Sequence, residues 1–130
     1  MFGKSILERI KQYDIEKLRI EYDSHPQYGK IDLDHFLPES VTEECANELD
    51  ALPLELGTKF TRRGSCMWEY NDLRHTPVQE KLVNILHSSE FIRWVERVSG
   101  VDKLIPDPHL IGAGYMKSFA GDTLKVHTDF

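Results

Sequence analysis

The residues best suited to chemistry in this sequence are a histidine and an aspartate near its last position, His127 and Asp129. They lie two residues apart in the run LKVHTDF, residues 124–130, whose composition predicts a β-strand. Successive side chains of a strand point to opposite faces, so residues i and i+2 point the same way. An imidazole and a carboxylate on one face are two of the three donors of a 2-His-1-carboxylate metal site.

Other groups of reactive residue types are better explained by structure than by chemistry. The two cysteines, Cys45 and Cys66, have no CxxC spacing and no paired histidines, so they are expected to be buried free thiols. Free thiols are typical of a reducing compartment, and the expected location is cytoplasmic. Ser65 and Cys66, taken with His75, lack the sequence context of an activated nucleophile.

Composition favours one ordinary globular domain over residues 1–130. The chain is 40% hydrophobic and 29% charged, with a formal net charge of −6. The negative charge argues against nucleic acid or an anionic membrane surface as a partner, because both would repel it. No apolar run is long enough to span a bilayer, and no signal peptide is recognisable at the first residues.

The elements that must position His127 and Asp129 begin with helices. Apolar spacing predicts a helix over residues 4–23 with a break near Asp14, and another that Pro38 opens and Pro53 ends. Thr76, Pro77 and Gln79 predict a helix start with a capping box. A further helix over residues 91–99 is expected to end at Gly100 in a left-handed cap.

Strands are expected around and after these helices. Alternating polarity predicts a strand over residues 31–37, and Trp68 and Tyr70 are expected on the core-facing side of another. Residues 109–117 are predicted to form a strand whose glycines permit a close backbone approach or a bulge. A turn at residues 121–122 then returns the chain as the strand that carries His127. The fold class is therefore α+β: residues 1–100 form a helix-rich lead-in and residues 101–130 begin a sheet.

The region from residue 91 to 130 resembles a known enzyme family. In order, it contains a helix ending in SGV, a PDP turn, a strand reading GAGY and the return GDTLKVHTD. The earlier run IDLDHFLP, residues 31–38, fits the same series. Together these motifs resemble the entry into the catalytic core of 2-oxoglutarate- and Fe(II)-dependent dioxygenases, in the group like the prolyl 4-hydroxylase alpha subunit.

The resemblance implies a double-stranded β-helix, or jelly roll, that holds Fe(II). His127 and Asp129 would be two of its three protein ligands, and Tyr115 would contact the co-substrate 2-oxoglutarate. Such enzymes hydroxylate a prolyl residue or a small molecule with O2 while 2-oxoglutarate is decarboxylated to succinate, in some cases with ascorbate. The partners implied are these small molecules.

The sequence also departs from the family pattern. The distal histidine ligand and the basic residue that pairs with 2-oxoglutarate have no match within residues 1–130, and His109 is the best substitute ligand. The expectation is that residues 1–130 are the amino-terminal portion of a dioxygenase, inactive in isolation. The alternative is a non-catalytic interaction module that uses an exposed jelly-roll edge, and unpaired edges would also permit self-association.

Overall fold

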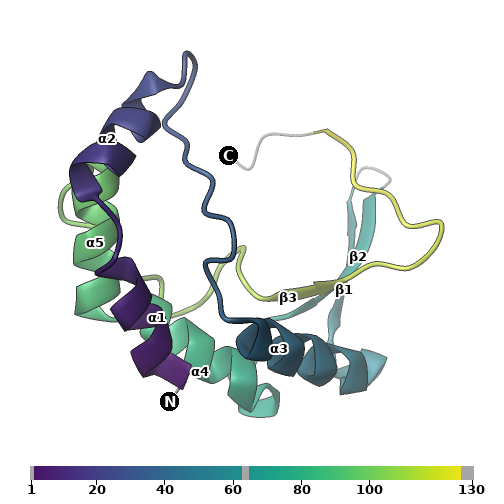
Figure 1. The fold of residues 1–130 in the computed structure, drawn as a ribbon. Coiled ribbons are helices and arrows are strands. Elements are labelled where there is room, and N and C mark those ends of the chain that lie inside the picture. The colour runs from purple at the N-terminus through teal and green to yellow at the C-terminus, as the bar shows by residue number, and fades with distance from the viewer. Residues whose placement is uncertain (1, 63–64, 127–130) are drawn as a thin grey trace.

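The chain is described by a computed structural model that covers residues 2–62 and 65–126 (Figure 1). The described residues form an α+β fold with five α-helices, two short 3₁₀ helices and one three-stranded sheet. In chain order the elements are α1 Phe2–Ile10, α2 Ile15–Ser24, α3 Glu39–Ala51, η1 Leu54–Leu56, β1 Thr58–Arg62, β2 Ser65–Tyr70, η2 Leu73–His75, α4 Pro77–Leu86, α5 Ser89–Ser99 and β3 Tyr115–Lys117. The predicted α+β class is confirmed at this level.

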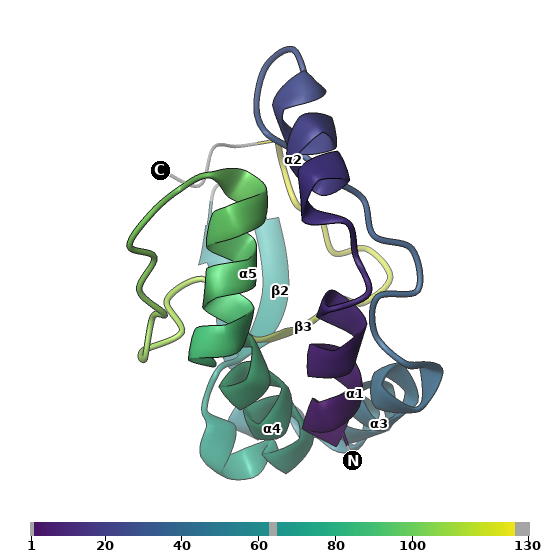
Figure 2. The same cartoon turned by 60° about the vertical axis from the view of Figure 1, so that its left-hand side comes forward.

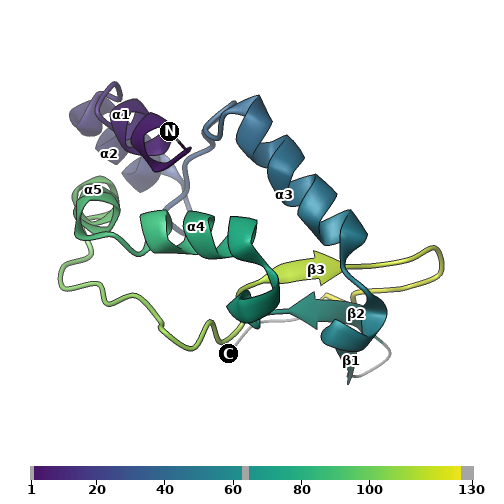
Figure 3. The same cartoon turned by 90° about the horizontal axis from the view of Figure 1, so that it is seen from below.

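The sheet is antiparallel with the order β1-β2-β3. Figure 3 shows α3 and α4 against one side of it. Two side chains of β3 confirm this placement: Tyr115 contacts Glu48 of α3, and the Lys117 ammonium donates to the carbonyl of Leu52 at 3.3 Å. The sheet therefore has one face turned to helices and one face turned away from them.

A second group of helices, α1, α2 and α5, packs away from the sheet (Figure 2). Its buried centre consists of Ile10, Leu18, Trp94 and Val98. Aromatic rings extend this core: Phe36 and Trp94 have ring centroids 6.2 Å apart, and Phe91 and Trp94 have centroids 5.7 Å apart. Burying large aromatic surface is the main stabilisation available to so small a cluster.

The expected break near Asp14 and the expected left-handed cap are confirmed. Asp14 begins α2 by accepting a hydrogen bond from the Lys17 amide at 3.1 Å, which satisfies one of the free amides of the first turn. Gly100 ends α5 with a φ of 68°, and its amide donates to the Glu96 carbonyl at 2.7 Å. Both signals are local in sequence.

The predicted capping box at the start of α4 is wrong. The Thr76 side chain is buried and makes no capping hydrogen bond. The amides of Val78 and Gln79 instead donate to the Glu48 carboxylate of α3, at 2.7 and 2.9 Å. Gln79 is therefore free to turn into the interior, where its side-chain amide donates to the Tyr70 carbonyl at 3.2 Å.

The predicted strand over residues 31–37 is also wrong, because this stretch has no strand partner among the described residues. Ile31, Leu33 and Phe36 nevertheless pack against the core of α2 and α5. His35 has a φ of 54°, which is incompatible with a continuous strand. The alternating apolar side chains of this segment therefore indicate one buried face, although its backbone is irregular.

The sheet is a hairpin of β1 and β2 extended by β3, in a region whose sequence is irregular. Tyr70 is 2% exposed and Trp68 is half-buried, so the core-facing prediction is confirmed for Tyr70. The strand expected over residues 109–117 is reduced to Tyr115–Lys117. Two features of the residues before β3 explain why the strand is shorter than predicted. Leu110 has a φ of 51°, and the Asp107 carboxylate accepts hydrogen bonds from the amides of His109 and Ile111 in a turn.

The expected close backbone approach in this segment is confirmed at Gly114. A Cβ there would lie 2.7 Å from the Tyr70 carbonyl oxygen, nearer than packed atoms can come. Gly114 also has a φ of 147°, a conformation that favours glycine. The residue therefore lets β3 meet the end of β2.

The turn at residues 119–122 exists, but it does not reverse the chain as predicted. The Phe119 amide donates to the Asp122 carboxylate at 2.8 Å, and the Asp122 amide donates to the Phe119 carbonyl at 2.9 Å. Lys117 pairs with Trp68, and beyond the turn the Thr123 carbonyl accepts from the Cys66 amide at 3.0 Å. The turn is therefore an outward loop, after which the chain continues in its earlier direction along β2.

Residues 124–126 form no strand, contrary to prediction, and the rest of the predicted strand, residues 127–130, lies outside the described residues. In the described part of the chain, no helix is long and apolar enough to cross a bilayer.

Candidate functional site

The two predicted metal ligands, His127 and Asp129, lie outside the described residues. The described chain ends at Val126, which is fully exposed. Three residues before it, the Thr123 carbonyl accepts a hydrogen bond from the amide of Cys66 on β2. The structure therefore describes the residues before His127, and the assignment of His127 and Asp129 as ligands stays a prediction.

Tyr115, the residue expected to contact 2-oxoglutarate, lies on the helix-facing side of the sheet. It pairs across the strands with Tyr70, and its hydroxyl donates to the Glu48 carboxylate at 3.0 Å. A bound 2-oxoglutarate would have to replace this carboxylate as the acceptor. The co-substrate role of Tyr115 therefore stays a prediction, while its contact with α3 is a feature of the structure.

Glu48 is the centre of a small polar junction between α3, α4 and β3. One carboxylate oxygen accepts the Val78 amide, and the other accepts the Gln79 amide and the Tyr115 hydroxyl. The two amides belong to the first turn of α4, where the helix dipole favours a negative charge. The side chain of Glu48 thus caps α4 and holds β3 against α3.

The surroundings raise the pKa of Tyr115 far above its ordinary value near 10. Burial is the largest cause, because it penalises the charged phenolate, and hydrogen bonding with Cys45 and Glu48 adds to it. Tyr115 is therefore a neutral hydrogen-bond donor throughout the physiological range. It can orient a carboxylate, which is the role it performs with Glu48, but it cannot act as a base.

The described residues alone do not supply a metal site. Within residues 2–62 and 65–126, no group of three or more His, Cys, Asp or Glu side chains could hold a metal ion. His127 and Asp129 are a donor pair of the kind that Fe(II) accepts, one imidazole and one carboxylate. The donor chemistry fits iron, and a complete site would need at least one further ligand.

The two cysteines, expected to be buried, are free and half-buried. Cys45 lies on α3 at the junction with Tyr115. Cys66 lies on β2, where its amide contacts Thr123.

Glu48 and the charged surroundings of Trp94 were not predicted from the sequence. For Glu48 a signal was present: it lies three residues after Cys45 and four before Leu52, which places it beside the apolar stripe of α3. For Trp94 the signal was a tryptophan on the buried face of α5 with arginines on both sides of it, Arg93 and Arg97.

Comparison of the chain with protein-family models, with curated proteins and with solved structures finds no match. Its function therefore has to be inferred from its own residues.

Proposed function

We propose that this chain contributes to the catalytic domain of a 2-oxoglutarate- and Fe(II)-dependent dioxygenase with a jelly-roll core. In this proposal His127 and Asp129 are two of the iron ligands, and Tyr115 lies near the co-substrate. The iron, when bound, would supply the activation of O2 that hydroxylation of a prolyl residue or a small molecule requires. The chain's own contribution is to hold two donors on one face of a strand.

The observation that carries the proposal is the H-x-D pair at the end of a chain segment that runs along β2. Tyr115–Lys117 pairs with β2, and Thr123 lies beside Cys66 further along the same strand. This path brings the backbone as far as Thr123 along the edge of the antiparallel sheet. A continuation of that edge would present His127 and Asp129 on one face, as metal binding requires.

The ligand assignment can be tested without activity, with Mn(II) as a paramagnetic substitute that accepts the same oxygen and nitrogen donors. We expect Mn(II) to broaden the amide resonances near residue 126 at high concentration only, since two donors hold a metal loosely. His127→Ala and Asp129→Ala should each abolish the broadening.

His109→Ala is the matched control, because His109 is an exposed histidine on a preceding turn. It should leave the broadening unchanged, and loss of broadening in this variant would make His109 a ligand instead. Broadening that survives His127→Ala would overturn the assignment. Tight binding by this chain alone would contradict the expectation of an incomplete donor set.

A second candidate function, an interaction module, is favoured by the distribution of exposed apolar side chains. Ile105 is 87% exposed and Ile111 is 82% exposed, both in the segment between α5 and β3. On the sheet face turned away from the helices, Met116 is 49% exposed and Phe60 is 38% exposed. Apolar side chains left exposed on a sheet face are candidates for a contact surface.

This second function predicts self-association through the open sheet face. Light scattering should then give a mass above that of one chain for the wild type and for His127→Ala. Met116→Lys should restore the monomer, whereas Ile20→Lys, a change of an exposed residue on α2, should not. A wild-type monomer at high concentration would exclude this reading.

A further inference from the structure

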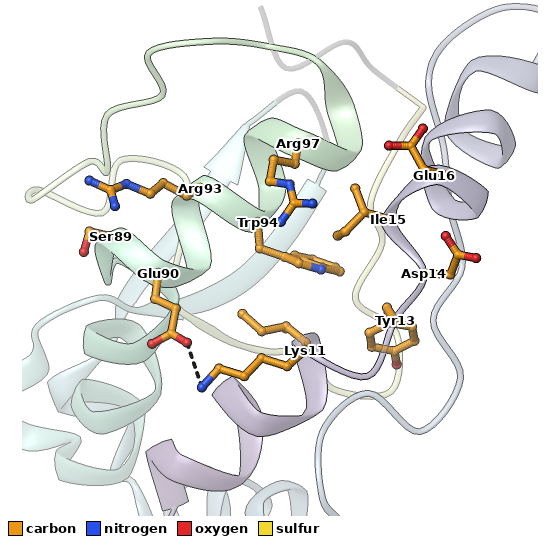
Figure 4. Close-up of a pocket in the computed structure, with 11 residues that line it drawn as sticks. Lys11, Tyr13, Asp14, Ile15, Glu16, Ser89, Glu90, Arg93, Trp94 and Arg97 are labelled. Atoms are coloured by element: carbon orange, nitrogen blue, oxygen red, sulfur yellow. Dashed lines mark ion pairs between the residues drawn. The ribbon is translucent and has the colours of Figure 1, made fainter.

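A pocket of about 630 Å³ opens between α5 and the segment that joins α1 to α2 (Figure 4). Its volume lies in the range of small-molecule sites, roughly 300–1,000 Å³. It is lined by residues of α1, α2, α5 and the segment that joins α1 to α2, and none of the predicted ligands is among them.

The inner wall of the pocket is apolar and aromatic. Ile10 is 3% exposed and Trp94 is 9% exposed, and the Tyr13 ring lies 6.0 Å from the Trp94 ring. Ile15 completes this wall beside the indole (Figure 4). Such a surface suits the methylene groups of a ligand, which gain from leaving water.

One side of the pocket is cationic. Arg93 and Arg97 lie one turn apart on α5 and both line the pocket. Within the described part of the chain neither guanidinium has an ion pair, in contrast to Arg19, which contacts Asp23 at 2.7 Å. Figure 4 shows the Arg97 guanidinium against the indole and the Arg93 side chain directed away from it, so Arg97 is the one suited to bind a carboxylate through paired N–H groups beside the apolar wall.

The facing side is anionic. Asp14 and Glu16 line the pocket from the start of α2, across the indole from the arginines (Figure 4). Lys11 does not neutralise them, because its ammonium contacts Glu8 at 3.1 Å and Glu90 at 3.2 Å. The two sides therefore carry opposite charge, with the Trp94 indole between them.

The indole N–H of Trp94 is enclosed by the side chains that surround the ring. The nitrogen is buried and has no hydrogen-bond partner among the described residues. Buried donors of this kind are rare in folded proteins, and each calls for a specific explanation. The resonance of this N–H therefore reports changes in the packing around the indole.

We propose that this pocket binds an ω-amino carboxylic acid, a small molecule with an ammonium and a carboxylate at opposite ends of an apolar chain. The carboxylate lies against Arg97, the ammonium lies against Asp14 and Glu16, and the methylenes lie along Trp94. This proposal does not depend on the proposed dioxygenase function, because no residue is shared between the two sites.

The test uses three probes of matched length: 6-aminohexanoate, hexanoate and hexylamine. Binding is followed by the indole N–H resonance of Trp94 in an ¹⁵N correlation spectrum, with the resonance of Trp68 as an internal control. We expect 6-aminohexanoate to shift the Trp94 signal and leave that of Trp68 in place. Hexanoate and hexylamine, each with one charge, should bind roughly tenfold more weakly, as expected for loss of one charge-assisted contact.

Two variants that each remove one exposed charge test the contacts at the two ends of the ligand separately. Arg97→Gln should weaken binding of 6-aminohexanoate and leave binding of hexylamine unchanged, and Glu16→Gln should weaken 6-aminohexanoate and leave hexanoate unchanged. Arg74→Gln is the matched control, because Arg74, on η2, contacts Asp72 and does not line the pocket. It should bind like the wild type.

Two results would overturn the proposal. One is a Trp94 resonance that 6-aminohexanoate does not move at millimolar concentration. The other is equal affinity for 6-aminohexanoate and for one of the singly charged probes, since the pocket would then recognise one charge only.

Discussion

The Tyr115 hydroxyl donates to the Glu48 carboxylate at 3.0 Å, across 67 residues of sequence. The same carboxylate accepts two amides from the first turn of α4. One side chain of α3 therefore holds both the helix that covers the sheet and the strand that leads toward His127. The position of that strand depends on a residue far from it in sequence.

Replacing Glu48 by alanine should lower the free energy of unfolding by about 2–3 kcal/mol, because three donors lose a charged acceptor in a partly buried site. Urea unfolding measures this change. Glu44→Ala is the matched control, since Glu44 is an exposed residue of the same helix. Equal stability of the two variants would mean that water replaces the carboxylate at no cost.

Tyr115→Phe should change how stability depends on alkaline pH. The pKa of Tyr115 is raised in the folded protein, so the folded state holds a proton that the unfolded state releases near pH 10. This contribution is fully present below pH 10 and is lost as the pH rises above it. The urea midpoint of the wild type should fall more steeply between pH 9 and 11 than that of Tyr115→Phe. Tyr28→Phe, at an exposed tyrosine, should behave like the wild type.

The helices could be predicted because their signals are local. Asp14 and Gly100 act on amides and carbonyls within their own helices, so sequence spacing is sufficient to find them. The capping box at Thr76 failed because an acceptor from another helix, Glu48, was better placed. Spacing within a segment carries no information about such a competitor.

The sheet was harder to predict, because pairing depends on distant residues. Residues 31–37 have the alternation of a strand, but Ile31 and Leu33 pack on helices. The loop at residues 119–122 has the composition of a hairpin turn, yet the chain continues along β2. The H-x-D pair, recognised from spacing alone, lies outside the described residues and stays a prediction.

Removing the partner of Asp72 should raise the pKa of its carboxyl group. Hydrogen bonding to the Arg74 guanidinium is the main cause that lowers this pKa to about 2 from its ordinary value of 3.8. In Arg74→Gln the pKa should return toward 3.8, as read from the carboxyl ¹³C shift during an acid titration. The pKa of Asp107, which hydrogen bonds from the His109 and Ile111 amides hold below its ordinary value, should be the same in both proteins. An unchanged Asp72 titration would show that the pair does not persist in solution.

Gly114 and Gly112 offer a test of how β3 is held against β2. Both have positive φ, at 147° and 75°, so alanine is strained at either position by about 1 kcal/mol. At Gly114 the added methyl would also lie 2.7 Å from the Tyr70 carbonyl oxygen, whereas at Gly112 it would meet no atom within 4 Å. Gly114→Ala should therefore lower the free energy of unfolding by about 2–3 kcal/mol, because backbone atoms must separate, and Gly112→Ala by about 1 kcal/mol. Urea unfolding of both variants, with amide exchange at Tyr115, Met116 and Lys117, decides the matter: equal losses would mean that β3 does not pair with β2 as described.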